Sequence, residues 1–207
     1  AISFGGEGTN HTVVSLISDS GGNLYVGGAF TQAGGTAVSR IAKWDGSMWS
    51  PLGAGMNDTV RALALASNGD LYAGGSFTTA GGVAANRIAK WNGSSWSAIG
   101  TGANDTVNAL KLDSSDNLFI GGAFTTAGGT TVNRIAKWNG TSWSALDTGM
   151  NDIVYAVAVH PSGDLYAGGA FTTAGGTTVN RIAKWNGTSW AALSSGFDVT
   201  ARALVFD

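Results

Sequence analysis

The stretch Leu24-Tyr25-Val26-Gly27-Gly28-Ala29-Phe30 decides the fold, because it returns three times at a constant interval. Each copy lies 47 residues after the one before, without insertion or deletion, at residues 71–77, 118–124 and 165–171. The segment Arg40 to Trp44 keeps the same interval in all three later copies. An unbroken period of this length predicts stacked units, each of which buries its faces against its neighbours.

The unit in the middle of the chain reads as four β-strands separated by turn residues. The first strand, Val60 to Leu65, is apolar on both faces and ends at a Ser-Asn-Gly-Asp turn. The second, Leu71 to Phe77, carries a Gly-Gly pair, which predicts the close approach of a neighbouring unit. A long threonine-rich loop leads to the third strand, Arg87 to Trp91, and Asn92-Gly93 turns the chain into the fourth, Trp96 to Ile99. No helical period or capping pattern occurs, so the fold class is all-β.

The third and fourth strands predict a tight hairpin. If Asp45-Gly46 is a two-residue turn, Trp44 pairs with Ser47 and Ala42 pairs with Trp49. The two tryptophans are then diagonal neighbours on one face, and we expect them to pack within the protein rather than to stack on a sugar. The arginine that opens the third strand is expected to stack on a tryptophan or to hold a backbone carbonyl. It recurs at Arg40, Arg87, Arg134 and Arg181.

Composition excludes several classes of function. Only 12% of residues are charged, the net charge is −2 and the basic residues are evenly spaced, so nucleic-acid binding is not expected. The absence of cysteine excludes disulfides, thiolate zinc sites and thiol catalysis. No apolar run approaches the roughly 18 residues that span a membrane. Residues 1–4 lack the pattern of a signal peptide, so an exported protein would begin here as a mature chain or a fragment. We expect no cofactor.

Four-stranded units of this length are typical of the blades of a β-propeller. The repeat resembles the kelch class: a strand ending in Gly-Gly, a strand ending in an aromatic residue, a short turn and a tryptophan. It is more similar to bacterial delta-sixty-type repeats and to the kelch-like repeats of fungal cell-polarity marker proteins, over residues 10–207. It departs from standard kelch in its shorter turn and its long threonine-rich loop. The resemblance implies a propeller and leaves the ligand open. The segments that carry it are residues 60–63, 71–77 and 86–91.

We expect one propeller domain or a propeller fragment over residues 1–207. Its blades would occupy about residues 10–56, 57–103, 104–150 and 151–197, with partial strands at 1–9 and 198–207. Ile2 to Gly6 align with a fourth strand and Ala201 to Phe206 with a first strand. Four blades could close with spare strands, chains could assemble through those strands, or the chain could be part of a longer repeat protein, which we favour.

The polar loops are the candidate ligand surface. Because strands alternate in direction, the loop after the second strand and the connection between blades emerge on the same rim, and loops on a rigid scaffold often carry function. Their side chains suit hydrogen bonding to a glycan or to a protein. The candidate ligand-binding residues are Asn57, Asp58, Thr79, Asn86, Asn104, Asp105, Thr126, Asn133, Asn151, Asp152, Thr173 and Asn180.

Catalytic and metal sites are not indicated. The repeated aspartates can equally cap turns, and they lack the dense spacing of a calcium loop. His11 and His160 occupy positions that are not equivalent in the repeat, so they form no predicted ligand or nucleophile cluster.

The sequence therefore predicts a non-catalytic, extracellular or cell-surface β-propeller of bacterial secreted type. It would bind carbohydrate or protein through equivalent loops, so that avidity replaces single-site affinity. The alternative is a purely structural scaffold that forms homo-oligomers through unpaired terminal strands. A propeller hydrolase or lyase is the remote alternative, because an intact repeat rarely encodes the asymmetric pair of acids that hydrolysis needs.

Overall fold

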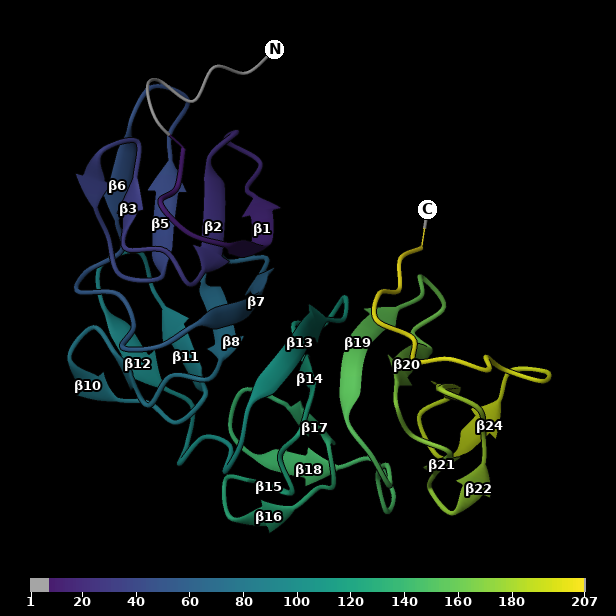
Figure 1. The fold of residues 1–207 in the computed structure, drawn as a ribbon. Coiled ribbons are helices and arrows are strands. Elements are labelled where there is room, and N and C mark those ends of the chain that lie inside the picture. Colours follow the sequence, from purple (N-terminus) through teal and green to yellow (C-terminus); the bar gives the residue numbers. More distant parts are fainter. Residues whose placement is uncertain (1–7, 207) are drawn as a thin grey trace. The chain divides into compact units, whose positions relative to one another are not determined.

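A computed structural model describes residues 8–206 of the chain. These residues form four repeated four-stranded antiparallel sheets (Figure 1), which confirms the prediction of an all-β fold built from four-stranded units. The described residues contain no helix, and therefore none long and apolar enough to cross a membrane. Contacts divide the chain into two compact units, Ala1–Gly102 and Ala103–Asp207, and two sheets belong to each.

The first unit holds the sheets β1–β2–β5–β6 and β7–β8–β11–β12, in which each strand pairs with the next. The first sheet comprises β1 (Val13–Ser18), β2 (Leu24–Gly28), β5 (Ile41–Trp44) and β6 (Trp49–Pro51). The second comprises β7 (Val60–Leu65), β8 (Leu71–Gly75), β11 (Ile88–Trp91) and β12 (Trp96–Ala98).

The second unit repeats this arrangement with the sheets β13–β14–β17–β18 and β19–β20–β23–β24. One sheet comprises β13 (Val107–Leu112), β14 (Leu118–Gly122), β17 (Ile135–Trp138) and β18 (Trp143–Ala145). The other comprises β19 (Val154–Val159), β20 (Leu165–Gly169), β23 (Ile182–Trp185) and β24 (Trp190–Ala192).

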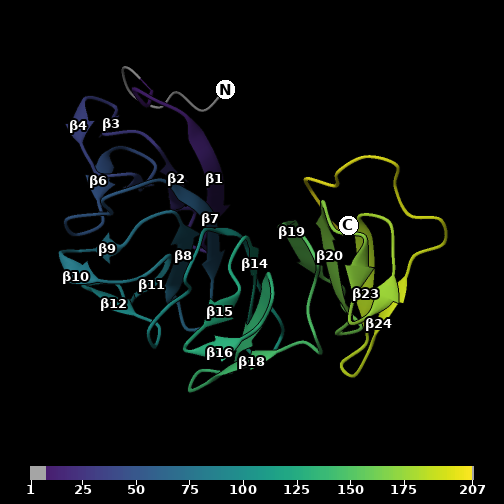
Figure 2. The ribbon, with the colours of Figure 1, turned by 60° about the horizontal axis from the view of Figure 1, so that its bottom comes forward.

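The long loop between the second and third strands of each sheet is itself a small β-hairpin, which we call the loop hairpin. In the second blade Gly81 and Gly82 turn it with φ of 59° and 83°, values that a two-residue turn requires and glycine accepts. Figure 2 shows β9 and β10 beside β12, and β10 contacts that strand. The loop hairpins are β3–β4 (Gln32–Ala33, Thr36–Ala37), β9–β10 (Thr79–Ala80, Val83–Ala84), β15–β16 (Thr126–Ala127, Thr130–Thr131) and β21–β22 (Thr173–Ala174, Thr177–Thr178).

Glycine in the second strand lets the first strand of the following blade lie directly on it. A Cβ atom on Gly27 would come within 2.5 Å of Val60 Cγ1, and one on Gly121 within 2.5 Å of Val154 Cγ1. The prediction that the Gly-Gly pair marks an approach between blades is therefore confirmed, within each unit, for the first glycine of the pair. The second glycine instead lies against its own blade, as Gly75 does against the Thr59 carbonyl. The phenylalanine that follows each pair is fully buried: Phe30, Phe77, Phe124 and Phe171.

The predicted pairing of the third and fourth strands is wrong by two residues. Trp44 pairs with Trp49 rather than Ser47, and Ala42 pairs with Pro51. The cause is the side chain of Asp45, whose Oδ1 accepts the backbone N–H groups of Ser47 at 2.8 Å and of Met48 at 2.9 Å. Because these bonds stabilise a longer turn, the tryptophans face each other directly across the ladder, with ring centroids 5.4 Å apart.

The predicted trailing strand at Ala201 to Phe206 is also wrong, since residues 193–206 contain no strand. A strand needs a regular series of backbone bonds to a neighbour, and between residues 201–206 and β20 the structure shows one, from Ala201 N–H to Gly169 O at 3.2 Å. The predicted leading strand, Ile2 to Gly6, lies outside the described residues.

Candidate functional site

Asn57 joins the connection before β7 to the loop hairpin of the same blade. Its Oδ1 accepts the backbone N–H groups of Thr78 at 2.9 Å and of Thr79 at 3.0 Å. Its Nδ2 donates to Thr78 Oγ1 at 2.8 Å. One exposed amide therefore accepts both backbone N–H groups at the start of β9. These bonds fix the loop hairpin against the connection. We call this arrangement the asparagine staple.

The staple recurs in every blade. Asn104 makes the same three bonds to Thr125 and Thr126, and Asn151 bonds Thr172 and Thr173 in the same way. Asn10 staples the first loop hairpin. Asn10 was not among the predicted ligand residues, although the 47-residue interval aligns it with Asn57. The structure thus uses the candidate ligand residues Asn57, Asn104 and Asn151 to hold their own hairpins.

A second set of asparagines ties the end of the second, third and fourth loop hairpins to the connection that follows the blade, whereas the first blade has Ser39 at this position. Asn86 Nδ2 donates to Thr101 O at 3.0 Å. Asn133 donates to Thr148 O at 2.8 Å, and Asn180 to Ser195 O at 2.7 Å. Within residues 8–206 the Oδ1 atom of each of these three amides takes no hydrogen bond, so it remains an acceptor at the surface.

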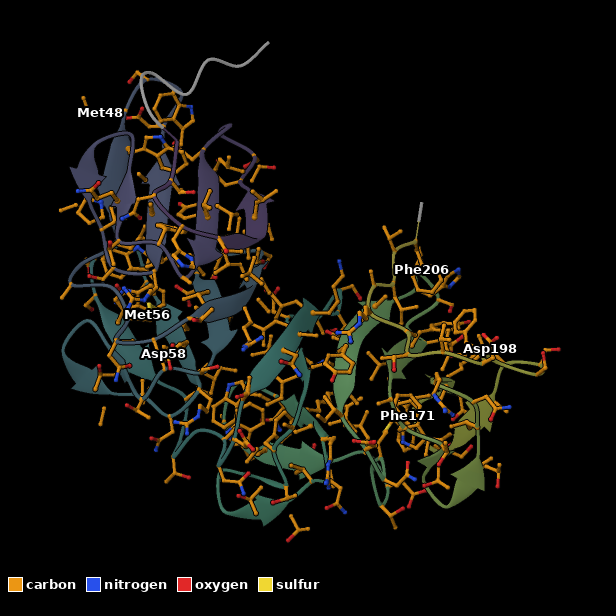
Figure 3. The ribbon with its side chains drawn as sticks, viewed as in Figure 1. Met48, Met56, Asp58, Phe171, Asp198 and Phe206 are labelled. Carbon is orange, nitrogen blue, oxygen red and sulfur yellow. The ribbon has the colours of Figure 1, made fainter. Side chains whose placement is uncertain are left out.

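The repeated aspartates lie on the connections, next to the staples. Asp58, labelled in Figure 3, is exposed, and its Oδ1 accepts the N–H of the following residue at 2.6 Å. Asp105 and Asp152 make the same bond at 2.6 and 2.7 Å. In all three, Oδ2 takes no hydrogen bond from another described residue. No cluster of three or more His, Cys, Asp and Glu side chains suited to a metal occurs in residues 8–206.

The predicted threonines begin the loop hairpins. Thr79, Thr126 and Thr173 are half-buried, and the staple holds the backbone N–H of each. The structure therefore brings each of them together with the staple asparagine of its blade. Further exposed hydroxyls lie after the turn, on the second strand of the third and fourth loop hairpins. They belong to Thr130, Thr131, Thr177 and Thr178.

The tryptophans of the fourth strands lie under the loop hairpins. A Cβ atom on Gly81 would come within 2.9 Å of Trp96 Cδ1, so only glycine fits above the ring. Trp96 Nε1 donates to Leu52 O at 2.8 Å, and Trp190 Nε1 to Leu146 O at 3.0 Å. These buried rings tie neighbouring blades together, as the sequence indicates, and offer no face to a sugar.

The repeated arginines adopt a backbone conformation that sequence reasoning missed. Arg87 has a φ of 65°, its N–H donates to Phe77 O at 2.8 Å and its carbonyl accepts Gly75 N–H at 2.9 Å. Its Nη1 also lies 3.5 Å from Phe77 O, which matches the predicted contact with a carbonyl. The equivalents Arg40, Arg134 and Arg181 have φ of 65°, 69° and 63°. A left-handed arginine carries no sequence signal, because most such positions hold glycine or asparagine.

Two ion pairs link a third strand to the turn before the second strand, away from the loop hairpins. Lys90 Nζ is 2.9 Å from Asp70 Oδ2, and Lys184 Nζ is 2.8 Å from Asp164 Oδ2. The hydrogen bond to Asp70 raises the pKa of Lys90 above its usual value, and the corresponding bond to Lys184 lowers the pKa of Asp164. Each pair joins the third strand of a blade to the turn before the second strand, and neither is part of the candidate site.

Solved structures share this fold. The chain matches the extracellular domain of a one-component system of B. thetaiotaomicron at 15% identity and a TM-score of 0.63, over 99% of this chain and 25% of that one. It matches the RRP9 WD40 repeats at 17% identity and a TM-score of 0.60, over 89% and 52%. For the WD40 beta propeller domain of Doa1 the identity is 17%, the TM-score 0.54 and the coverage 76% and 48%. The chain thus spans from a quarter to about half the length of these proteins, and at such identities the likeness shows the fold alone.

No protein in the curated set matches the sequence. A family model described as the Rax2 C-terminal beta propeller domain matches residues 3–152 and, in a second overlapping match, residues 44–202. The two matches together cover nearly the whole repeat array, and their overlap follows from the internal repetition of the chain. With the four repeated sheets, they establish a β-propeller repeat protein without singling out the kelch class. The chain belongs to the Rax2 C-terminal beta propeller domain family.

Proposed function

We propose that the chain is a non-catalytic binding module, of kelch-like or delta-sixty type, that holds a glycan or a protein on its loop hairpins and connections. The observation that carries the proposal is the asparagine staple, which recurs in every blade and fixes each hairpin on its connection. A fixed loop loses less conformational entropy on binding than a mobile one. The staple therefore favours a preorganised contact surface.

The groups left over after stapling define the chemistry of the ligand. The carboxylate Oδ2 of Asp58 and the amide Oδ1 of Asn86 are acceptors, and the exposed threonines of β16 and β22 supply hydroxyls in the third and fourth blades. Such a set suits a ligand rich in O–H donors, so we place a glycan first and a protein second. Each single contact is weak at an exposed site, and repetition in several blades supplies avidity.

We further propose an extracellular or cell-surface location for this chain, in a bacterial secreted protein. The extracellular domain of the B. thetaiotaomicron system supports the proposal, although the WD40 domains matched carry no such description. Protease treatment of intact cells of the source organism tests it. Cleavage of the chain on unbroken cells supports surface display, and protection that is lost only after lysis contradicts it.

A glycan array probed with the chain at high density tests the binding function. The decisive variant is the triple substitution Asp58→Asn, Asp105→Asn and Asp152→Asn, which keeps an Oδ1 acceptor for the following N–H and removes the charged Oδ2. We expect its binding to fall at least about tenfold, on the scale of one lost charge-assisted hydrogen bond. A single substitution should give a smaller loss than the triple one, because avidity is shared among blades.

The matched control is Asp45→Asn. Asp45 holds the turn after the third strand of the first blade, at the end of that strand away from the loop hairpin. Asn92 makes the same bonds at the equivalent position of the second blade. The control should bind like the parent. The proposal is overturned if no glycan and no protein ligand is retained, or if the triple variant binds as tightly as the control.

A self-assembling scaffold is the second candidate function. The observation that favours it is the uncovered apolar face of β1, on which Val13 and Leu16 are exposed. This surface is separate from the loop hairpins, so the two functions can be tested independently.

A further inference from the structure

A depression of about 180 Å³ lies between the third and fourth blades, at the ends of the strands opposite the loop hairpins. The first strands of these blades, β13 and β19, lie side by side in the second unit (Figure 1). The depression opens where each of them turns back toward the second strand of its own blade. A cavity of about 10–15 Å³ already holds one water, so this one has room for a small organic group. Among the residues that line it are Leu112, Asp113, Ser114, Val159, His160 and Pro161.

The fourth-blade side of the depression departs from the repeat. The 47-residue interval aligns His160 and Pro161 with an aspartate or alanine followed by a serine in the other blades. A site that uses the imidazole would therefore occur once per chain, unlike the repeated acceptors of the loop hairpins. The aligned pairs are Asp19-Ser20, Ala66-Ser67 and Asp113-Ser114.

A series of hydrogen bonds places the proton of the His160 ring on Nδ1. Lys184 Nζ lies 2.8 Å from Asp164 Oδ2, which also accepts the Ser162 hydroxyl at 3.0 Å. The pKa of Asp164 is lowered, chiefly by its bond to Lys184, so the carboxylate is ionised and can only accept. Since the Ser162 hydroxyl has a single proton, its 2.7 Å contact with His160 Nδ1 requires a proton on Nδ1. The exposed Ser162 N–H, 3.1 Å from Nδ1, is then left to solvent.

The other ring nitrogen of His160 is consequently an acceptor. With the proton on Nδ1, Nε2 of the neutral ring carries a lone pair, and the bonded Nδ1–H fixes the orientation of the ring. Within residues 8–206, Nε2 takes part in no hydrogen bond. The depression stays open although Phe206 packs edge-on against the ring, with the ring centroids 5.1 Å apart.

Two further acceptors stand on the third-blade side. Asp113 is a carboxylate that forms no ion pair with any lysine or arginine that the structure describes. Its Oδ1 accepts the N–H groups of Ser115 and Asn117, both at 2.9 Å. Its Oδ2 accepts Asn117 Nδ2 at 2.8 Å and keeps a second lone pair. Ser114 is exposed, and its hydroxyl makes no hydrogen bond with another residue in the range 8–206.

These walls suit a primary ammonium on a short unbranched alkyl stem. An ammonium has three N–H donors and no acceptor, and the depression offers three acceptors, one of them charged. None of the residues that line it is Arg, Lys, Asn or Gln, so a sugar, whose hydroxyls also accept, would find few donors. The apolar surface of Leu112, Val159 and Pro161 suits methylene groups.

We propose that the depression between the third and fourth blades binds a primary alkylammonium group, one per chain. Its N–H groups would donate to Asp113, Ser114 and His160 Nε2, and its stem would lie on Leu112 and Val159. Two sources present this group: a lysine side chain of a protein and a free alkyl amine. The site goes beyond ligand binding by the loop hairpins. It shares no residue with the asparagine staples, so either function can fail without the other.

Nuclear magnetic resonance of the histidine rings tests the site directly, because the chain has only two histidines. We expect n-butylammonium chloride to shift the Cε1–H signal of His160 saturably and to leave that of His11 in place. The probe n-butanol has the same stem without the charge. It should bind at least about tenfold more weakly, because it loses a charge-assisted hydrogen bond.

Asp113→Asn is the decisive variant, because it keeps an Oδ1 acceptor for the turn and removes the charge. We expect the affinity for n-butylammonium, measured by calorimetry, to fall at least about tenfold. His160→Ala should weaken binding as well. It gives the fourth turn the residue that the second blade already carries, Ala66, so folding should survive. Circular dichroism of each variant checks the fold.

The matched control is Asp19→Asn. Asp19 Oδ1 accepts the N–H groups of Gly21 at 3.0 Å and of Asn23 at 2.9 Å, and its Oδ2 accepts Asn23 Nδ2 at 2.7 Å. It thus holds its turn as Asp113 does, but the following blade carries Ala66 where the second unit carries His160. The control should bind n-butylammonium like the parent chain.

Lysine blocked as N-acetyl-lysine amide distinguishes the two sources, because its side chain is the same butylammonium group. Binding at least as tight as that of n-butylammonium assigns the site to a protein lysine, and binding weaker by about tenfold or more assigns it to a free amine. The proposal is overturned if n-butylammonium leaves the His160 signal in place, if n-butanol binds as tightly, or if Asp113→Asn binds as tightly as Asp19→Asn.

Discussion

Asn57 and Thr78 exchange hydrogen bonds in both directions: the Thr78 N–H donates to Asn57 Oδ1 at 2.9 Å, and Asn57 Nδ2 donates to Thr78 Oγ1 at 2.8 Å. Asn57→Ala removes both of these bonds and the one from Thr79 N–H to Asn57 Oδ1, so two backbone donors lose their acceptor. We expect the free energy of unfolding to fall by about 1–2 kcal/mol. Asn57→Asp keeps the acceptor and loses the donor, so it should cost less. Urea unfolding followed by tryptophan fluorescence measures both.

Thr101→Ala is the control for the staple, because Thr101 is exposed and only its backbone carbonyl is used, by Asn86. This substitution should leave the urea midpoint nearly unchanged. If Asn57→Ala is no more destabilising than Thr101→Ala, the staple does not hold the loop hairpin.

The contact between blades predicts a strong response to one methyl group. In Gly121→Ala the new Cβ would lie 2.5 Å from Val154 Cγ1, and such overpacking costs about 1–3 kcal/mol. Val154→Ala removes the clashing atom, so the double variant should be more stable than the sum of the two single effects predicts. Thermal unfolding of the four proteins gives the coupling. Gly8→Ala, which meets nothing within 4 Å, is the neutral comparison, and strict additivity would contradict the close contact.

The strands were predictable because their residue types recur with a fixed period. The predicted first strand of the second blade, Val60 to Leu65, coincides with β7, whereas the second was predicted two residues too long at its end. The turn after Trp44 was not predictable from Asp45-Gly46 alone. Its length depends on whether the Asp45 side chain or a cross-strand partner takes the N–H of Ser47.

The candidate site was predictable in position but not in role. Sequence places Asn57 on the rim, and the amide of that residue faces the loop hairpin rather than solvent because Thr78, 21 residues away, returns to meet it. A contact between residues 21 positions apart can be inferred only when the position of β9 relative to the connection is known. The staple of Asn10 in the first blade could have been inferred from the repeat interval.

The left-handed arginines give a prediction that contacts alone would not suggest. Arg87→Ala and Arg87→Gly lose the same side-chain contacts, but alanine keeps the strained φ of 65° whereas glycine accepts it. We expect the glycine variant to be more stable than the alanine variant by about 1 kcal/mol, despite the usual entropic cost of glycine. Urea midpoints measured on the two variants side by side decide the matter. An alanine variant that equals or exceeds the glycine variant would show that the surrounding backbone bonds relax the strain.

The ion pair between Lys90 and Asp70 predicts how stability depends on pH. Burial raises the pKa of Asp70, but the hydrogen bonds from Lys90 and Asn68 outweigh it, so the pKa lies below its usual value of 3.8. A lowered folded-state pKa contributes stability above the unfolded value, and that contribution is lost as the pH falls through the folded value. The pKa of Lys90 is raised above 10.5, chiefly by its hydrogen bond to Asp70, so its contribution is lost as the pH rises through the folded value.

Asp70→Asn should therefore lower the urea midpoint at neutral pH and flatten its decline in strong acid and in strong alkali. Asparagine is compatible with this place in the fold, because Asn23 and Asn117 hold the equivalent positions in the first and third blades. The comparison is Asp198→Asn, at an exposed carboxylate outside the strands. It should leave the pH profile of the urea midpoint unchanged. If the urea midpoint of Asp70→Asn depends on pH as that of Asp198→Asn does, in both acid and alkali, the ion pair is too well solvated to stabilise the sheet.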